Sequence, residues 1–263
     1  DNYKVPRIGF VNKMDRSGAN FYEVVKDVET KLGSKAIPLQ VPIGEEERFK
    51  GVVDLITGKA MVWNEDDMGM TFTEIPVPAD LVEIVAEWRG KLLEAVAEYD
   101  DTLLEKFFED PESISPDEMR IAIRQAVCDM KFVPMMCGAA FKNKGVQAVL
   151  DAVCAFLPSP VDIEGIKGIN PKTDLEELRK PSVDEPFAAL AFKIATDPYV
   201  GRLAFMRVYS GALDAGSYVL NTRSGNKERI SRLYKMHANK QNPIDRLECG
   251  DIAAGVGFKD IRT

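Results

Sequence analysis

The sequence predicts an α/β domain built on a parallel sheet, with an inserted α+β segment, followed by an all-β barrel. Three observations predict this arrangement. Two strand-loop-helix units stand at the two ends of the first 160 residues, a long segment of mixed strand and helix patterns separates them, and short strand patterns with glycine turns follow. Repeated strand-loop-helix units build parallel sheets, whose ligands bind beyond the carboxyl ends of the strands. The two loops are therefore the first place to look for a site.

The first unit begins with residues 5–11, VPRIGFV, a short apolar run that predicts a buried strand. Pro6 lies near its start, where proline is tolerated. Apolar residues then recur at helical spacing over residues 19–32, with Asn20 or Ser17 as the N-cap and Gly33 as the stop.

The second unit repeats this order, with a strand over residues 132–136, a loop over 137–144 and a helix over 145–157. Pro158 and Pro160 end the helix. We assign residues 1–35 and 131–160 to one partial α/β domain with a parallel sheet.

Residues 36–130, between the two units, predict an inserted α+β subdomain. Strand patterns cover residues 37–43, 51–56, 60–63 and 70–75. Helices are expected over residues 80–99 with Asp80 as the cap, over 102–108, and from Ser115-Pro116 toward Met130.

The proline-containing and highly charged residues 161–185 are typical of a connector. From residue 186 to Thr263, strand patterns recur at residues 188–194, 202–209, 216–221, 227–234 and 252–256. This regular spacing predicts a β-barrel domain, which we expect to be cut short at Thr263.

Composition excludes several classes of protein. The longest apolar runs fall short of the roughly 18 residues that cross a bilayer, and the N-terminus lacks the layout of a signal peptide. We therefore expect no membrane segment and a cytoplasmic location. The four cysteines form no Cys-x-x-Cys pair that would indicate a metal or redox site, and one histidine, His237, is a weak basis for a catalytic triad.

The net charge of −8 is unevenly distributed. Residues 74–119 hold fourteen acidic and three basic residues, a net charge of −11, whereas residues 183–263 hold twelve basic and nine acidic residues, a net charge of +3. An acidic segment suits a basic protein partner, while +3 is weak support for nucleic-acid contact.

The residues that close the first strand suit a guanine base. Asp15 offers two acceptor oxygens to the N1–H and amino edge of guanine, which adenine cannot match. Asn12 is placed to tie the second loop to the first, and the stem of Lys13 to lie over the base. In the second loop, residues 137–142, small residues let a backbone N–H approach guanine O6. A polar loop and a tight turn are the plainer interpretations of these two segments.

The predicted helix 80–99 carries an acidic stripe, formed by Glu83, Glu87, Glu94 and Glu98, opposite an apolar face. Simple solvation explains such a stripe in most proteins. A partner-binding surface is the alternative.

Longer segments resemble the elongation factor G family of translational GTPases. The segments are VPRIGFVNKMDRSGANF, CGAAFKNKGVQAVLDAVCAFLPSP and TDPYVGRLAFMRVYSGAL. Asn12-Lys13-Met14-Asp15 resembles the fourth GTPase motif and residues 138–142 the fifth, so the resemblance implies base contacts from Asn12, Lys13, Asp15, Ala139, Ala140 and Phe141. It also implies a P-loop-GTPase-like sheet, GTP or GDP with Mg²⁺ in the complete protein, and the ribosome, through its RNA and stalk protein, as partner of a monomer. Because the insertion contacts the stalk protein in this family, the resemblance favours the acidic stripe of Glu83, Glu87, Glu94 and Glu98 as a partner-binding surface.

The sequence departs from the family pattern in two ways. Ala139 stands where the fifth motif usually has serine, so we expect weaker order in the loop and a base contact carried by the backbone N–H of Ala140. No Gly-x-x-x-x-Gly-Lys-Ser/Thr sequence occurs, and none of the Asp-x-x-Gly segments precedes the fourth motif. We expect an internal piece that has no catalytic or metal-binding residues, binds nucleotide weakly and is inactive by itself.

Other origins remain open at this stage. Tetracycline-resistance protection proteins and peptide release factor three are ribosomal GTPases with different insertions. A standalone protein-binding module that uses the acidic helix or the barrel belongs to a different class.

Overall fold

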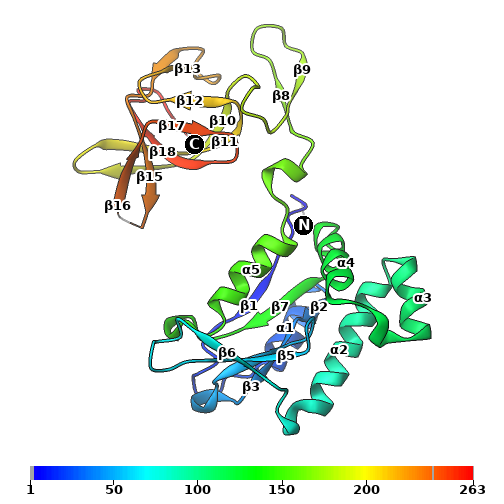
Figure 1. Cartoon of the computed structure of the whole chain (residues 1–263). Coiled ribbons are helices and arrows are strands. Elements are labelled where there is room, and N and C mark those ends of the chain that lie inside the picture. Colours follow the sequence, from blue (N-terminus) through cyan, green and yellow to red (C-terminus); the bar gives the residue numbers. More distant parts are fainter. Residues whose placement is uncertain (1–2, 239, 263) are drawn as a thin grey trace. The chain divides into compact units, whose positions relative to one another are not determined.

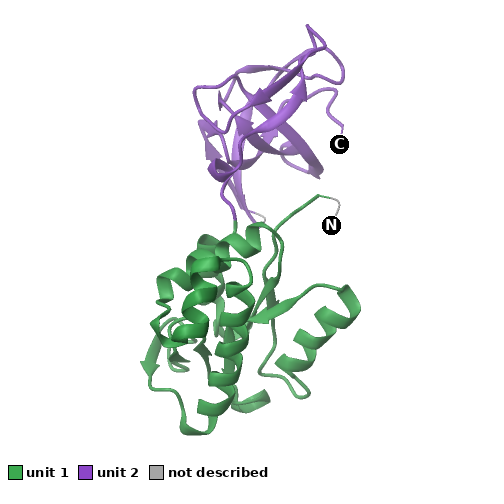
Figure 2. Ribbon diagram, turned by 90° about the vertical axis from the view of Figure 1, so that its right-hand side faces the viewer, with its two compact units in different colours: residues 1–157 green, residues 158–263 purple. Residues whose placement is uncertain are grey.

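The computed structural model describes residues 3–238 and 240–262. The chain forms two compact units, Asp1–Leu157 and Pro158–Thr263, shown in different colours in Figure 2. Each unit is described by itself below.

A parallel three-stranded sheet organises the first unit (Figure 1). Its order is β1 (Gly9–Val11), β7 (Val133–Cys137) and β2 (Ala36–Pro38), and both pairs are parallel. Val11 pairs with Cys137, so the two strands end side by side. The parallel sheet is confirmed, although β1 is shorter than predicted because Val5 and Arg7 are exposed and precede the paired residues.

The sequence placed the start of the inserted subdomain at residue 36, which is too early. Ala36 pairs with Val133 inside the parallel sheet, and the Leu39 N–H donates to the Met135 carbonyl at 2.9 Å. The predicted strand 37–43 is in fact two strands, because the chain leaves β2 and enters a second sheet at Gln40. A continuous apolar run did not reveal this change of partner.

Two helices follow the strands of the parallel sheet, as predicted. Helix α1 (Phe21–Leu32) begins after Asn20, whose side chain accepts a hydrogen bond from the Glu23 N–H at 3.1 Å. It ends at Gly33, which adopts the left-handed conformation with φ 63°. Helix α5 (Val146–Phe156) follows β7 through the second loop.

The inserted segment forms a four-stranded antiparallel sheet and three helices. The strands are β3 (Gln40–Ile43), β4 (Gly51–Asp54), β5 (Lys59–Trp63) and β6 (Phe72–Ile75), in that order. The helices are α2 (Val82–Ala97), α3 (Asp101–Glu109) and α4 (Pro116–Cys128).

Of the two helix starts predicted in the insertion from a cap residue, the one at Ser115 is confirmed and the one at Asp80 is wrong. Ser115 forms a capping box with Glu118, and Pro116 occupies the first turn of α4. Asp80 does not cap α2, because residues Ala79–Leu81 form a 3-10 turn and α2 begins only at Val82, with Leu81 at the N-cap.

The inserted sheet shares its apolar cores with the parallel sheet. One cluster packs α2, α4 and α5 around β2 and β3. A second cluster joins Met14 and Ala139, from the two loops, to Phe49, Val52 and Trp63 of the inserted segment. The insertion therefore folds against the two loops as part of one unit.

The second unit is antiparallel, as predicted for a β-barrel domain. Its largest sheet has the order β10 (Ala188–Asp197), β11 (Gly201–Ser210), β18 (Ile252–Val256), β15 (Arg232–His237), β16 (Lys240–Ile244). Two smaller pairs are β12 (Ala212–Asp214) with β17 (Arg246–Glu248), and β13 (Tyr218–Leu220) with β14 (Lys227–Arg229). The predicted strand 227–234 is interrupted between β14 and β15, and β12, β16 and β17 were not predicted.

The segment 161–185, predicted to be a connector, contains a hairpin of β8 (Ile166–Ile169) and β9 (Glu176–Arg179). Among residues 3–238 and 240–262, no helix is both long and apolar enough to cross a membrane.

Candidate functional site

The two predicted loops meet at the carboxyl edge of the parallel sheet. The Gly138 N–H donates to the Val11 carbonyl, and the Met14 N–H donates to the Gly138 carbonyl, both at 3.0 Å. The strand pair β1–β7 is thus extended into the loops, and the side chains of Asn12 and Asp15 stand beside the second loop.

Asn12 ties the two loops together. Its side-chain oxygen accepts hydrogen bonds from the Lys13 N–H at 2.8 Å and from the Ala140 N–H at 3.0 Å. The Ala140 N–H is the donor expected for guanine O6, so a base that uses it must take over or share this proton with Asn12.

Asp15 is the predicted base-reading carboxylate. Its side chain is 12% exposed and its Oδ2 lies 3.2 Å from Nζ of Lys142, in the second loop. Burial by itself would raise the pKa of Asp15, but the hydrogen bond and charge of Lys142, with the backbone N–H of Asp15, outweigh it and lower the pKa. The carboxylate is therefore ionised at neutral pH and accepts hydrogen bonds with both oxygens.

The remaining predicted base contacts differ in exposure. Lys13 is exposed and has φ 63°, a left-handed conformation that is uncommon for a residue with a side chain. Phe141 is fully exposed, so its ring is available to a ligand. Ala139 is 1% exposed and packs in the core with Met14, so its side chain is not open to a ligand and its predicted base contact is not seen.

Gly138 allows the close approach of the two loops. A Cβ atom at this position would lie 2.3 Å from the Lys144 carbonyl oxygen and 2.8 Å from the ring of Phe10. No side chain fits there without a backbone shift.

Sequence comparison agrees with this geometry. The family model for the elongation factor Tu GTP binding domain matches residues 1–159, which include both loops, and the model for elongation factor Tu domain 2 matches residues 201–263. The chain belongs to the elongation factor Tu GTP-binding family. Its resemblance to elongation factor G is also confirmed.

Relatives named elongation factor G match the whole chain. Identity is 67% for Cytophaga hutchinsonii, 64% for Amoebophilus asiaticus and 55% for Karelsulcia muelleri, in each case over all 263 residues. The chain spans 37–38% of the length of these proteins. A crystal structure of a Thermus thermophilus protein is also similar, with a TM-score of 0.75 and 25% sequence identity. The match covers 97% of this chain and 34% of the Thermus thermophilus chain.

Within this family fold, the acidic residues of α2 lie outside the loop site. Glu83, Glu87, Glu94 and Glu98 are all exposed. Glu87 pairs with Lys91 at 2.5 Å and Glu98 with Lys35 at 2.7 Å. The hydrogen bond from Lys35 lowers the pKa of Glu98. Two of the four are thus engaged in ion pairs within the chain.

Several residues at the site had no assigned role in the sequence analysis. Lys142 faces Asp15, Glu46 accepts the Gly18 N–H at 2.6 Å, and Lys144 is almost completely buried beside the second loop. Lysines in a polar loop are usually exposed, so only the neighbouring GTPase motif could have drawn attention to them.

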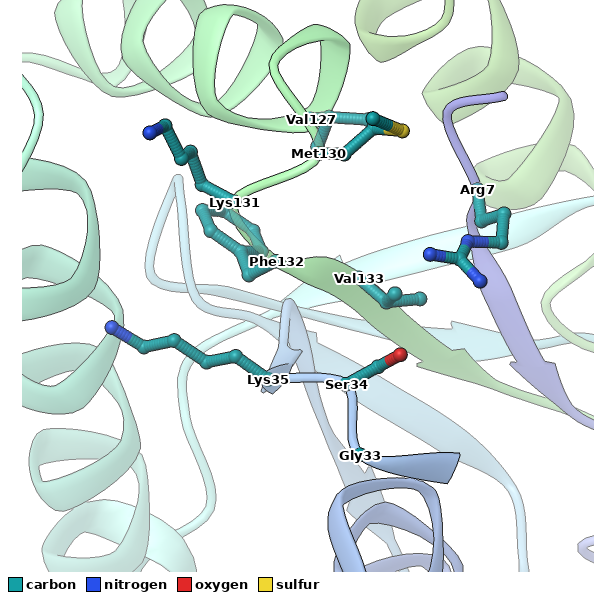
Figure 3. A pocket seen from close by; sticks show the side chains of 9 residues that line it. All are labelled: Arg7, Gly33, Ser34, Lys35, Val127, Met130, Lys131, Phe132 and Val133. Atoms are coloured by element: carbon teal, nitrogen blue, oxygen red, sulfur yellow. The ribbon is translucent and has the colours of Figure 1, made fainter. Parts of the chain in front are cut away.

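A small basic cavity lies at the opposite, amino edge of the parallel sheet (Figure 3). It is lined by residues that lead into each strand, including Arg7, Lys35 and Lys131. Figure 3 shows the Lys35 and Lys131 side chains extending to the same side, where both ammonium groups lie near the ring of Tyr99. This cavity is separate from the two loops that follow β1 and β7.

No group of three or more His, Cys, Asp or Glu side chains arranged to hold a metal ion occurs within residues 3–238 and 240–262.

Proposed function

We propose that this chain is the base-recognising part of a ribosome-dependent translational GTPase like elongation factor G, whose complete form drives movement of transfer and messenger RNA in the cytoplasm. The juxtaposition of Asp15 and Ala140, held by Asn12 at the carboxyl edge of a parallel sheet, carries this proposal. The whole-chain similarity to proteins named elongation factor G supports it.

Each residue has a distinct role in the proposed complex. Asp15 accepts from N1–H and the amino group of guanine, and the Ala140 N–H turns from Asn12 to guanine O6. Lys13 and Phe141 lie along the faces of the base, while Ala139 orders the loop. Because adenine presents the opposite pattern of donors and acceptors, this set selects guanine.

The phosphates and Mg²⁺ are proposed to be held elsewhere in the complete protein. Phosphoryl transfer depends on a phosphate loop and a magnesium ion that neutralise the charge of the transferring group. The 263 residues contain no phosphate-loop sequence, so their contribution to the reaction is to orient the base. A monomer with the ribosomal stalk protein as partner of the α2 acidic stripe completes the proposal.

The test replaces Asp15 with asparagine in the full-length protein. Asp15→Asn puts a donor opposite the guanine amino group, so GDP binding should weaken by about 2–3 kcal/mol. Xanthosine diphosphate, whose C2 oxygen accepts a hydrogen bond, should bind better than to the unaltered protein. Titration with fluorescent analogues of both nucleotides measures the two affinities.

Asp27→Asn is the matched control, since it removes an exposed helical ion pair with Lys31 and leaves the loops unchanged. It should bind both nucleotides like the unaltered protein. If Asp15→Asn kept the original preference for GDP, the assignment of the base site would be wrong.

A further inference from the structure

The buried ammonium group of Lys144 connects the second loop to the insertion. Lys144 is 2% exposed, and its Nζ lies 3.0 Å from the Phe49 carbonyl oxygen and 2.7 Å from Oε1 of Glu65. Both partners belong to the insertion: Phe49 lies two residues before β4 and Glu65 two residues after β5. An ammonium group away from water needs such partners, so Lys144 fixes the distance between the loop and the insertion.

The backbone of Lys144 closes the same loop. Ala139 and Lys144 form an isolated antiparallel bridge, with N–H to carbonyl distances of 2.9 and 3.2 Å. Ala140 and Lys142, which face Asn12 and Asp15, lie inside this closed loop. A displacement of Lys144 would therefore also move Ala140 and Lys142.

The segment between β5 and β6, residues 64–71, makes further contacts with the loop; we call it the β5–β6 loop. Asn143 donates to the Met68 carbonyl at 3.3 Å, and Gln147 donates to the Gly69 carbonyl at 2.9 Å. The indole N–H of Trp63 donates to the side-chain oxygen of Gln147 at 3.1 Å. The β5–β6 loop thus contacts residues that precede and residues that follow Lys144 in the sequence.

The two backbones also touch directly. A Cβ atom at Gly69, which has φ 74°, would lie 2.3 Å from the Lys142 carbonyl oxygen. The β5–β6 loop therefore lies against the turn that carries Lys142 and Ala140.

We propose that the β5–β6 loop holds the second guanine loop in its base-reading position, with Lys144 and Glu65 as positioning residues. This inference rests on the proposed guanine site and assigns it a support within the insertion. Loss of the support releases guanine O6 first, because the O6 donor lies in the supported loop while Asp15 lies in the other.

The test measures discrimination at O6 in the full-length protein. 6-Thioguanosine diphosphate keeps both the N1–H and the amino group read by Asp15 and replaces O6 with sulfur, a weaker hydrogen-bond acceptor. The ratio of its affinity to that of GDP therefore reports on the second loop. Lys144→Met keeps the length of the side chain and removes its charge. It should reduce the preference for GDP about three- to tenfold and speed GDP dissociation, and Glu65→Gln should act in the same direction with about a twofold effect.

Glu74→Gln is the matched control, because it breaks the exposed Lys59–Glu74 pair on strands β5 and β6, away from the loop. It should leave the preference unchanged. Since Glu65 is 75% exposed, Glu65→Gln should fold even if Lys144→Met does not.

An unchanged preference and dissociation rate in a folded Lys144→Met variant would overturn the inference. If that variant is unfolded, an unchanged Glu65→Gln variant decides the matter in the same way. Failure of the base site itself would be seen separately, as an Asp15→Asn variant whose preference for GDP over xanthosine diphosphate equals that of the unaltered protein.

Discussion

Single residues decide how closely the two loops of the proposed guanine site approach each other. At Gly138 an alanine Cβ would be placed 2.3 Å from a backbone oxygen, so the loop must move to accept it. We expect Gly138→Ala to lower the free energy of unfolding by about 1–3 kcal/mol and to weaken GDP binding to the full-length protein. Chemical denaturation and nucleotide titration measure the two effects.

Gly90 provides a matched control for this prediction. It lies inside helix α2, and an added Cβ would meet nothing within 4 Å. Gly90→Ala should therefore stabilise the protein by about 0.5–1 kcal/mol through helix propensity. If both alanine variants changed the free energy of unfolding alike, the close approach at Gly138 would not be what decides the stability of the variant.

At the same scale, sequence reasoning succeeded where the predicted topology decides and failed where side-chain packing decides. The link from Asn12 to the second loop was predicted although Ala140 lies 128 residues further along the chain, because loops that follow neighbouring parallel strands meet at one edge of the sheet. The burial of Lys144 was not predicted, because it depends on how the insertion, with Phe49 and Glu65, packs against the second loop. The Lys142–Asp15 pair was also missed, because nothing in the spacing of the lysines marks Lys142 as the one that faces Asp15.

At the scale of elements, helix α2 presents its acidic stripe to solvent while its other face packs on the core. Val85, Leu92 and Val96 are buried, and Trp88 stacks on Tyr22 of α1 with ring centroids 5.5 Å apart. The apolar face of the helix is therefore fixed against the core. Its exposed carboxylates are free to meet a basic partner only where they are not already paired.

The ion pairs of the stripe change how it should be tested. Reversing Glu87 and Glu98 also breaks their pairs with Lys91 and Lys35, at a cost of up to about 1 kcal/mol each. The double variant Glu83→Lys and Glu94→Lys avoids this cost. It should slow association with ribosomes at low salt, because rim charges act mainly on the association rate.

The control reverses two exposed acidic residues of α3, Glu105→Lys and Glu109→Lys, and so changes the net charge equally. Its association rate, measured by stopped flow, should stay near that of the unaltered protein. Equal slowing by both variants would mean that net charge, and not the stripe, governs the encounter.

Element boundaries followed the sequence at most of the predicted caps, Asp80 being the exception. Asn20, Gly33 and Ser115 marked their helix ends correctly, because each satisfies backbone groups locally. The division between β2 and β3 carried no such mark, since it depends on which strand lies alongside. Strand β16 was missed because Pro243 and polar residues gave it no strand pattern.

At the scale of the whole molecule, the two loops supply the proposed base site, and the sequence contains no phosphate-loop motif. A carboxylate and one or two N–H donors contribute a few kcal/mol, against the entropic cost of association. The 263-residue chain should therefore bind GDP with a Kd near millimolar or weaker and should not hydrolyse GTP. Calorimetric titration with GDP and magnesium checks this, and micromolar binding would show that the affinity resides in these residues.

The pairing of Gly9 with Met135 also predicts an order of folding. Most of the first unit lies between these partners, whereas β4 and β5 pair across the short turn from Asp54 to Lys59. Closing the larger loop costs more chain entropy, so the local hairpins form first. Pulse-labelling hydrogen exchange during refolding should find β4 and β5 protected before β1, and the reverse order would refute this. During synthesis, on the order of ten seconds would pass between the addition of Asn12 and Asp15 to the chain and the addition of strand β7.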